Sequence, residues 1–253
     1  MAAPTSPPRQ LRRFADLDAL SRAAADELTQ IAHAAIAARG RCHIALSGGS
    51  TPKRLFGLLA QRGAAALPWD HIELWWGDER TVPPDHADSN YGMTRAALLD
   101  PLGIAAAHVH RIAAETDPAT AAAAYERELV AALGAPPIFD LVLLGMGPDG
   151  HTASLFPDSP ALEETARWVV ANPVSSPLVH GHTTRITLTA PAINAARHVR
   201  FLVAGADKAA SLAAVLDGPR EPRRYPSQLI ATRGADVAWL VDTAAAAALR
   251  GAP

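Results

Sequence analysis

The fold of this chain is decided by Ile44-Ala-Leu-Ser-Gly-Gly-Ser-Thr-Pro-Lys-Arg-Leu-Phe56, where a strand pattern gives way to a helical one. An apolar run ends at Leu46, a turn of glycine and hydroxyl residues follows, and Pro52 stands where a first helical turn tolerates proline. Such strand–turn–helix units build parallel sheets with helices packed on them. The segment therefore predicts an α/β fold.

The turn of this segment also has the features of an anion site. Backbone N–H groups at a helix start lack helical partners, and the positive end of the helix dipole lies behind them. Ser47, Ser50 and Thr51 add hydroxyl donors, while Gly48 and Gly49 allow close approach of a ligand. The spacing matches neither the Walker A nor the dinucleotide-binding pattern. The alternative is an ordinary turn capped by Thr51, but the continuous polar run favours a phosphate.

Short apolar runs alternate with helical stretches along the rest of the chain, and several runs are apolar on both faces. The expected fold is a mainly parallel sheet with helices on both faces, a Rossmann-like three-layer sandwich, in a single domain over residues 1–253. The expected strands are Cys42–Leu46, His71–Trp76, Phe139–Leu144, Trp168–Ala171, Arg185–Thr189, Val199–Ala204 and Val237–Val241. The expected helices are Asp16–Ala38, Pro52–Gln61, Tyr91–Leu99, Pro118–Leu133, Lys208–Leu216 and Thr243–Arg250, with Asp117 and Asp207 as helix-start signals.

Composition narrows the classes of function. The 253 residues carry 23 Lys+Arg against 25 Asp+Glu, a formal net charge of −2, which argues against a nucleic-acid partner held by a basic field. The only cysteine, Cys42, excludes an intrachain disulfide and a multi-cysteine zinc site. No apolar run has the length of a signal peptide or a membrane span. We therefore expect a cytoplasmic protein with no membrane partner.

A second informative stretch reads Trp75-Trp-Gly-Asp-Glu-Arg-Thr-Val-Pro-Pro-Asp-His-Ala-Asp-Ser-Asn-Tyr-Gly92, an apolar strand that runs into charged residues. In open α/β sheets, ligands bind outside the carboxyl ends of the strands, where this cluster falls. Arg80 has the fork that binds phosphate or carboxylate, and Asp78 suits sugar hydroxyls or the orientation of a base. The alternative is a loop clamp in which these two side chains satisfy each other. The polar residues of the following loop are typical of solvated loops, so no metal is expected.

A third stretch reads Asp140-Leu-Val-Leu-Leu-Gly-Met-Gly-Pro-Asp-Gly-His-Thr-Ala-Ser-Leu-Phe-Pro157, again an apolar strand that ends in a glycine-rich turn. It places Asp149 and His151 at the carboxyl end of its strand. A histidine there can take up a proton near neutral pH, and a nearby carboxylate can fix its tautomer. A lone histidine is more often an ordinary hydrogen-bonded residue, but the sheet edge shared with the other two stretches makes His151 the candidate base.

Two cations complete the candidate site. Arg185 begins the strand pattern Arg-Ile-Thr-Leu-Thr, and Lys208 begins a helix, where the dipole disfavours a cation unless an anion is bound. We expect both to converge with the Ser47–Thr51 turn on one sheet edge, although single cations are commonly just solvated. The pairs His108/His110 and His180/His182 have His-x-His spacing without an evident third ligand, so we expect surface histidines.

The motifs SGGSTP, WWGDERTVPPDHADSNYG, LLGMGPDGHTASLFP, RITLT and GADK, in this order, resemble the 6-phosphogluconolactonase family over about residues 44–216. The resemblance implies an α/β fold related to the glucosamine-6-phosphate isomerase/deaminases. It also implies hydrolysis of 6-phosphoglucono-1,5-lactone to 6-phosphogluconate, a step of the pentose phosphate pathway. The implied partner is a small sugar phosphate, and the implied assembly is a monomer or small homo-oligomer. No cofactor or metal is implied, because a lactone is a fairly reactive ester.

Site roles follow from that substrate. Its phosphate needs N–H donors and cations, which the Ser47–Thr51 turn, Arg185 and Lys208 can supply. His151 is the expected general base, with Arg80 or a backbone amide stabilising the developing oxyanion. Either Asp78 or Asp149 is expected to orient the histidine or the attacking water.

Two other classes of function remain alternatives. A deaminase or aldose–ketose isomerase of the same superfamily would carry Asp-Glu-Tyr in place of Asp78-Glu-Arg80 and an acidic residue where Leu155-Phe156 stand. A non-catalytic sugar-phosphate sensor would not need His151, and the residues before Ile44 leave little room for a DNA-binding domain. A dinucleotide-binding oxidoreductase is disfavoured, since no GxGxxG follows the first strand.

Overall fold

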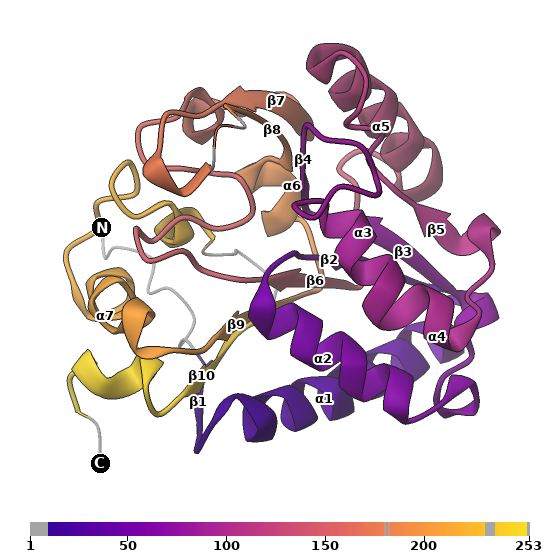
Figure 1. Ribbon diagram of the computed structural model, residues 1–253, viewed down its shortest axis with the longest axis horizontal. Coiled ribbons are helices and arrows are strands. Elements are labelled where there is room, and N and C mark those ends of the chain that lie inside the picture. The colour runs from indigo at the N-terminus through magenta and orange to yellow at the C-terminus, as the bar shows by residue number, and fades with distance from the viewer. Residues whose placement is uncertain (1–9, 180, 182, 231–235, 252–253) are drawn as a thin grey trace, which may run out of the picture.

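The computed structural model describes residues 10–179, 181, 183–230 and 236–251. Its centre is a seven-stranded sheet, ordered β1-β10-β9-β6-β2-β3-β5, in which every pair of neighbours is parallel (Figure 1). The strands are β1 (Gln10–Phe14), β2 (Cys42–Leu46), β3 (Ile72–Trp76), β5 (Val109–His110), β6 (Leu141–Leu144), β9 (His198–Val203) and β10 (Asp236–Asp242).

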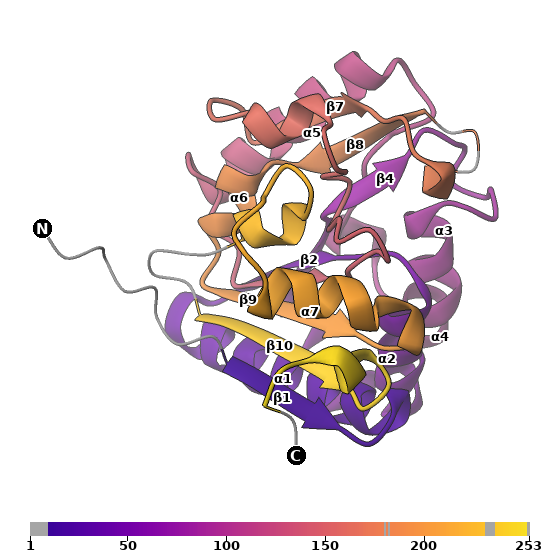
Figure 2. The ribbon, with the colours of Figure 1, turned by 90° about the vertical axis from the view of Figure 1, so that its left-hand side faces the viewer.

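Helices cover both faces of this sheet. Helices α1 (Leu17–Arg39) and α2 (Ser50–Gln61) lie on one face, and α7 (Ala209–Asp217) lies on the other (Figure 2). The two neighbouring tryptophans of β3 point to opposite faces of the sheet. The ring of Trp75 packs near that of Tyr125, with 6.0 Å between centroids, and the ring of Trp76 packs near that of Tyr91, with 5.5 Å between centroids. The helices that carry those tyrosines are α5 (Pro118–Leu133) and α3 (Asn90–Thr94); α4 (Asp100–Leu102) and α6 (Ala190–Asn194) are shorter. The predicted three-layer α/β fold is confirmed.

Burial explains why the central strands read as continuous apolar runs. All five residues of β3 and all four of β6 are buried, as expected where helices cover both faces. Side-chain caps likewise determine where two of the helices begin. Asp16 caps α1 through a bond from the Ala19 N–H at 2.7 Å, and Asp117 caps α5 through a bond from the Thr120 N–H at 2.9 Å.

A second sheet was not predicted. It is antiparallel, ordered β4-β8-β7, and consists of β4 (Asp78–Arg80), β8 (Thr184–Leu188) and β7 (Val169–Pro173). Two expected strands of the main sheet, Trp168–Ala171 and Arg185–Thr189, therefore belong here, and the expectation that Arg185 shares the main sheet's edge is wrong. The chain crosses between the sheets at Gly77, which donates its N–H to the Leu46 carbonyl and accepts from the Leu188 N–H, both at 2.8 Å.

Three local expectations are also corrected. Strand β1, which pairs with β10, was not among the expected strands and lies directly before α1. The helix expected over Thr243–Arg250 is a 3₁₀ turn at Ala245–Ala248. Helix α3 continues into a π turn at Arg95–Leu99 rather than running on as a regular helix. Among the helices of the described residues, none is long and apolar enough to span a membrane.

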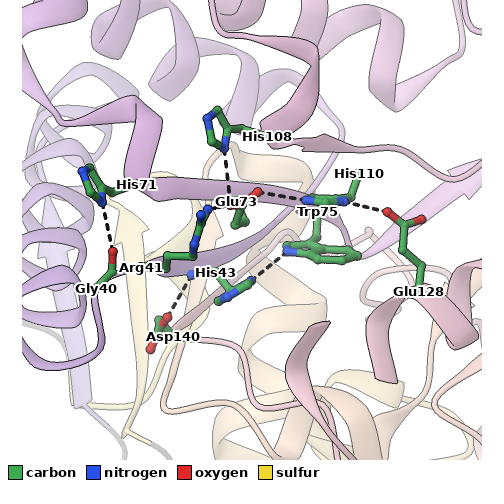
Figure 3. A network of polar contacts seen from close by, with 10 residues as sticks. All are labelled: Gly40, Arg41, His43, His71, Glu73, Trp75, His108, His110, Glu128 and Asp140. Atoms are coloured by element: carbon green, nitrogen blue, oxygen red, sulfur yellow. Dashed lines mark hydrogen bonds and ion pairs between the residues drawn. The ribbon is translucent and has the colours of Figure 1, made fainter. Parts of the chain in front are cut away.

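The histidines of the 108–110 pair are half-buried, not surface groups, and they surround Glu73 at the amino end of the strands (Figure 3). His110 contacts Glu73 Oε2 at 2.9 Å and Glu128 Oε1 at 2.6 Å, and its ring stacks on Trp75 at 3.9 Å. His108 and Arg41 contact the other Glu73 oxygen. The second pair, His180 and His182, lies outside the described residues.

Replacing Glu73 with glutamine should destabilise the fold in a pH-dependent way. Burial of Glu73 favours its neutral form, but hydrogen bonds from His110 and His108 outweigh this and hold its pKa below the usual range. A lowered folded-state pKa gives stability that is present above the unfolded value and lost as pH falls through the folded one. We expect Glu73→Gln to lower the free energy of unfolding by about 2 kcal/mol at pH 7, measured by urea denaturation.

The matched control is Glu128→Gln, since Glu128 is half exposed and contacts the same His110. We expect this change to cost less than about 1 kcal/mol. The difference between wild type and Glu73→Gln should shrink below about pH 4, where a carboxylate begins to take up its proton. Equal stability at pH 7 would contradict the role assigned to Glu73.

Candidate active site

A cavity of about 240 Å³ lies at the carboxyl ends of β2, β6 and β9. It joins the three stretches that the sequence singled out. All predicted site residues line it except Asp149 and Arg185, each of which lies beside a residue that does. Its lining consists of Ser47, Gly48, Gly49, Ser50, Thr51, Pro52, Asp78, Arg80, Asn90, Gly145, Met146, Gly147, Pro148, His151, Thr152, Ala153, Leu178, Leu202, Val203, Ala204 and Lys208.

The first wall is the turn between β2 and α2. Helix α2 begins at Ser50 with Gly49 as its N-cap, so the alternative of Thr51 as the cap is wrong. Gly49 has φ +104°, a conformation that favours glycine. Gly48 is required for packing, because a Cβ there would lie 1.7 Å from Asn90 Oδ1. The Ser47 hydroxyl is buried without a partner among the described residues, which suits a ligand that accepts a hydrogen bond from it.

Lys208 faces the same cavity from the start of α7. It is the N-cap residue of that helix, and its Nζ lies 2.8 Å from Asp207 Oδ2. Asp207 itself belongs to a 3₁₀ turn and does not cap α7, so its reading as a helix-start signal is wrong. The predicted conflict between a cation and the helix dipole is present at this position. The exposed carboxylate of Asp207 relieves it in part, and an anion in the cavity would relieve it further.

Because the chain crosses to the small sheet at Gly77, Asp78 and Arg80 lie on β4 and line the same cavity as the turn between β2 and α2. Asp78 is buried and accepts from the Ser154 hydroxyl at 2.6 Å through Oδ2 and from Asn90 Nδ2 at 3.3 Å through Oδ1. Arg80 donates to the Asp88 carbonyl. The alternative of a loop clamp, in which Asp78 and Arg80 hydrogen-bond only to each other, is wrong, because each side chain has other partners.

Arg185 pairs with Arg80 across β8 and β4, which brings two guanidinium groups together. Arg185 is 4% exposed; one of its terminal nitrogens donates to the Val179 carbonyl at 3.3 Å, and Nη1 has no partner among the described residues. Burial, reinforced by the charge of Arg80, lowers the pKa of Arg185. A buried guanidinium with an unused donor is costly unless an anion approaches it.

The third wall is the turn after β6, which fixes the His151 ring from several sides. Nδ1 lies 2.6 Å from Asp149 Oδ1, and the ring stacks on Phe156 at 4.1 Å. Gly147 lies against the ring so closely that a Cβ there would be 2.1 Å from Nδ1. Although burial opposes it, the hydrogen bond and charge of His151 hold the pKa of Asp149 below its usual value. An ionised Asp149 selects the tautomer with a proton on Nδ1, which leaves Nε2 as the basic nitrogen.

Comparison with known proteins identifies the family of the chain. A family model described as glucosamine-6-phosphate isomerases/6-phosphogluconolactonase matches residues 15–239. The chain belongs to this family. A 6-phosphogluconolactonase of Synechocystis sp. is 46% identical over 222 residues, covering 85% of this chain and 88% of that protein. One from Mycobacterium tuberculosis is 42% identical over 93% of this chain and 96% of its own length.

Solved structures of the family superpose on the whole fold. The 6-phosphogluconolactonase from Trypanosoma cruzi has a TM-score of 0.87 and 32% identity, covering 97% of this chain and 98% of that one. A monomeric glucosamine-6-phosphate deaminase is more distant, with a TM-score of 0.78 and 20% identity over 94% of this chain and 99% of that chain. The latter likeness concerns the fold alone.

Three polar residues at or beside the cavity were not among the predicted site residues. Asn90 is buried, lines the cavity and contacts both the carbonyl and the carboxylate of Asp78. Buried Glu79 accepts from the Asn90 and Tyr91 N–H groups at 2.8 Å and so holds the start of α3; its burial raises its pKa. Ser154 contacts Asp78 from the third stretch. Asn90 and Ser154 stand inside the quoted motifs, but only the meeting of the two sheets reveals their partner.

Proposed function

We propose that this protein hydrolyses 6-phospho-D-glucono-1,5-lactone to 6-phospho-D-gluconate, a step of the pentose phosphate pathway. The observation that carries the proposal is one cavity lined both by His151, which is paired with Asp149, and by a turn suited to a phosphate. The named relatives, 6-phosphogluconolactonases at 42–46% identity, support the same activity.

The substrate phosphate binds at the turn between β2 and α2. The N–H groups at the start of α2, the Ser47 and Thr51 hydroxyls and Lys208 line that part of the cavity. Arg185, the cross-strand partner of Arg80, adds positive charge, and its Nη1 is an unused donor among the described residues. Anchoring one end of the substrate in this way brings its lactone carbonyl toward His151 and Arg80.

His151 then acts as general base through Nε2. It removes a proton from water while the water oxygen attacks the lactone carbonyl carbon, and Arg80 stabilises the resulting oxyanion. When the intermediate collapses, the bond from that carbon to the ring oxygen breaks, and the ring oxygen takes the proton from His151. Asp149 stays ionised throughout and supports the imidazolium. Asp78, the other candidate for an orienting role, holds the attacking water.

The two alternatives fit less well. A deaminase needs an acidic group beyond the histidine turn, whereas Phe156 stacks on His151 at that place and Leu155 is fully buried. A binding module has no use for a histidine whose tautomer is fixed by a carboxylate. Both features of the His151 turn favour lactone hydrolysis.

The proposal is tested by two assays on the same purified protein. The first follows hydrolysis of freshly prepared 6-phosphogluconolactone above the rate without enzyme, and the second follows ammonia release from glucosamine-6-phosphate. We expect saturable lactone hydrolysis and no ammonia. Ammonia release without lactone hydrolysis would establish the deaminase, and activity in neither assay would favour a binding module.

A further inference from the structure

Ser154 follows His151 by three residues and is 1% exposed. Its three polar groups bond to all three strands of the small sheet. The hydroxyl donates to Asp78 Oδ2 of β4 at 2.6 Å, the N–H donates to Thr187 Oγ1 of β8 at 3.2 Å, and the carbonyl accepts from Asn172 Nδ2 of β7 at 2.8 Å. A single residue of the histidine turn therefore connects that turn to the whole second sheet.

The backbone beside Ser154 is strained in a way that serves this contact. Ala153 has φ +46°, a left-handed conformation that residues other than glycine rarely adopt. The turn is closed by a bond from the Leu155 N–H to the Thr152 carbonyl at 2.9 Å. Ala153 lines the cavity and Ser154 lies behind it. Strain of this kind persists where surrounding contacts fix it, and it is concentrated at functional sites.

The contact decides how Asp78 meets the cavity. A serine hydroxyl at 2.6 Å from a carboxylate oxygen is a short, charge-assisted hydrogen bond. It occupies Oδ2, while Oδ1 receives the longer bond from Asn90 at 3.3 Å. Asp78 lines the cavity, so the bond from Ser154 sets the rotation of the carboxylate and leaves Oδ1 to meet a ligand there.

We propose that Ser154 is a positioning residue for lactone hydrolysis, which acts by fixing the Asp78 carboxylate relative to the His151 base. The inference rests on the proposed function, in which Asp78 and His151 share the attacking water. Because Ser154 and His151 belong to one short turn, any displacement of that turn moves the base and the carboxylate together. The relative position of His151, which follows β6 of the main sheet, and Asp78, which lies on β4 of the small sheet, is thereby maintained.

The test is Ser154→Ala, which removes the hydroxyl and keeps the backbone bonds to Thr187 and Asn172. We expect kcat for 6-phosphogluconolactone to fall about 10- to 100-fold, the effect of a misplaced catalytic group, with KM within about twofold of wild type. Ser154→Cys, which fills the same space with a weak donor, guards against a simple packing defect and should give a similar loss.

The matched control is Ser159→Ala, since Ser159 is buried nearby and bonds to Asn172 and the Phe156 carbonyl rather than to Asp78. It should leave kcat within about twofold, in keeping with an unchanged reacting group. In an Asp78→Asn background, Ser154→Ala should lower kcat no further, because the two residues act as one unit.

The outcomes separate this proposal from the function it rests on. If the wild-type protein hydrolyses the lactone and Ser154→Ala does so equally well, the positioning role is wrong and the lactonase stands. An equal loss of kcat in the Asp78→Asn background, or in Ser159→Ala, also overturns the role. Absence of hydrolysis by the wild type overturns the proposed function itself.

Discussion

His151→Ala is expected to lower kcat for 6-phosphogluconolactone by about 10²- to 10⁴-fold, the usual contribution of a general base. The proposed phosphate anchor does not involve this side chain, so KM should change less than about threefold. The measurement is steady-state hydrolysis corrected for the rate without enzyme. Binding of 6-phosphogluconate, followed by calorimetry, should persist.

Two further variants locate the effect at the histidine pair. Asp149→Asn keeps the shape of the side chain but removes the charge that selects the Nδ1–H tautomer, so kcat should fall by an intermediate factor. His71→Ala is the matched control, because His71 bonds to the Gly40 carbonyl at the amino end of the sheet. It should leave hydrolysis unchanged. Near-normal turnover by His151→Ala would remove this residue as the base.

Arg185→Met is expected to weaken substrate binding and to stabilise the ligand-free protein at the same time. The change removes a buried guanidinium that has an unused donor and lies beside Arg80, and replaces it with an apolar side chain. We expect KM to rise about 10- to 100-fold through the lost positive charge. We expect the free energy of unfolding without ligand to rise by about 1 kcal/mol. Urea denaturation and steady-state kinetics on the same preparation measure both.

Arg200→Met is the matched control for these two opposed effects, weaker substrate binding and higher stability without ligand. Arg200 is equally buried, but its guanidinium is used by Glu27, by the Asp236 carboxylate and by backbone carbonyls. Its replacement leaves carboxylates unpaired and should cost about 2–4 kcal/mol. Loss of stability in Arg185→Met to the same degree would show that Arg185 is a structural residue rather than an anchor for an anion.

Local pattern was sufficient for the parts of the fold that depend on near neighbours. The apolar runs of β2, β3 and β6 are buried as predicted, and the strand–turn–helix pattern around Ser47–Thr51 places this turn at the cavity. Each motif carries its own strand end and its own turn. Parallel packing then brings such ends to one edge of the sheet without further information.

Long-range pairing explains what the sequence did not reveal. Strand β4 is three polar residues long, and nothing in its pattern separates it from a loop; it is a strand because Asp78, Glu79 and Arg80 pair with β8, more than a hundred residues later. The same pairing sets Arg185 beside Arg80, an arrangement that no local pattern predicts.

Glu73 was concealed in a similar way, as the one charged residue of an apolar strand. Its partners His108 and His110 stand across from it only because β5 pairs with β3. Read singly, each of the three is an ordinary polar residue. Their meeting at the amino end of the sheet converts two apparent surface histidines into parts of the fold.

The central claim is that a phosphate anchored at the turn between β2 and α2 presents a lactone to His151. The most direct test compares kcat/KM for 6-phosphogluconolactone with that for glucono-1,5-lactone, the same ring without phosphate. Two or three charge-assisted hydrogen bonds to the phosphate predict a ratio of about 10³ or more in favour of the phosphorylated substrate. A ratio near one would contradict the anchor and, with it, the placement of the substrate in this cavity.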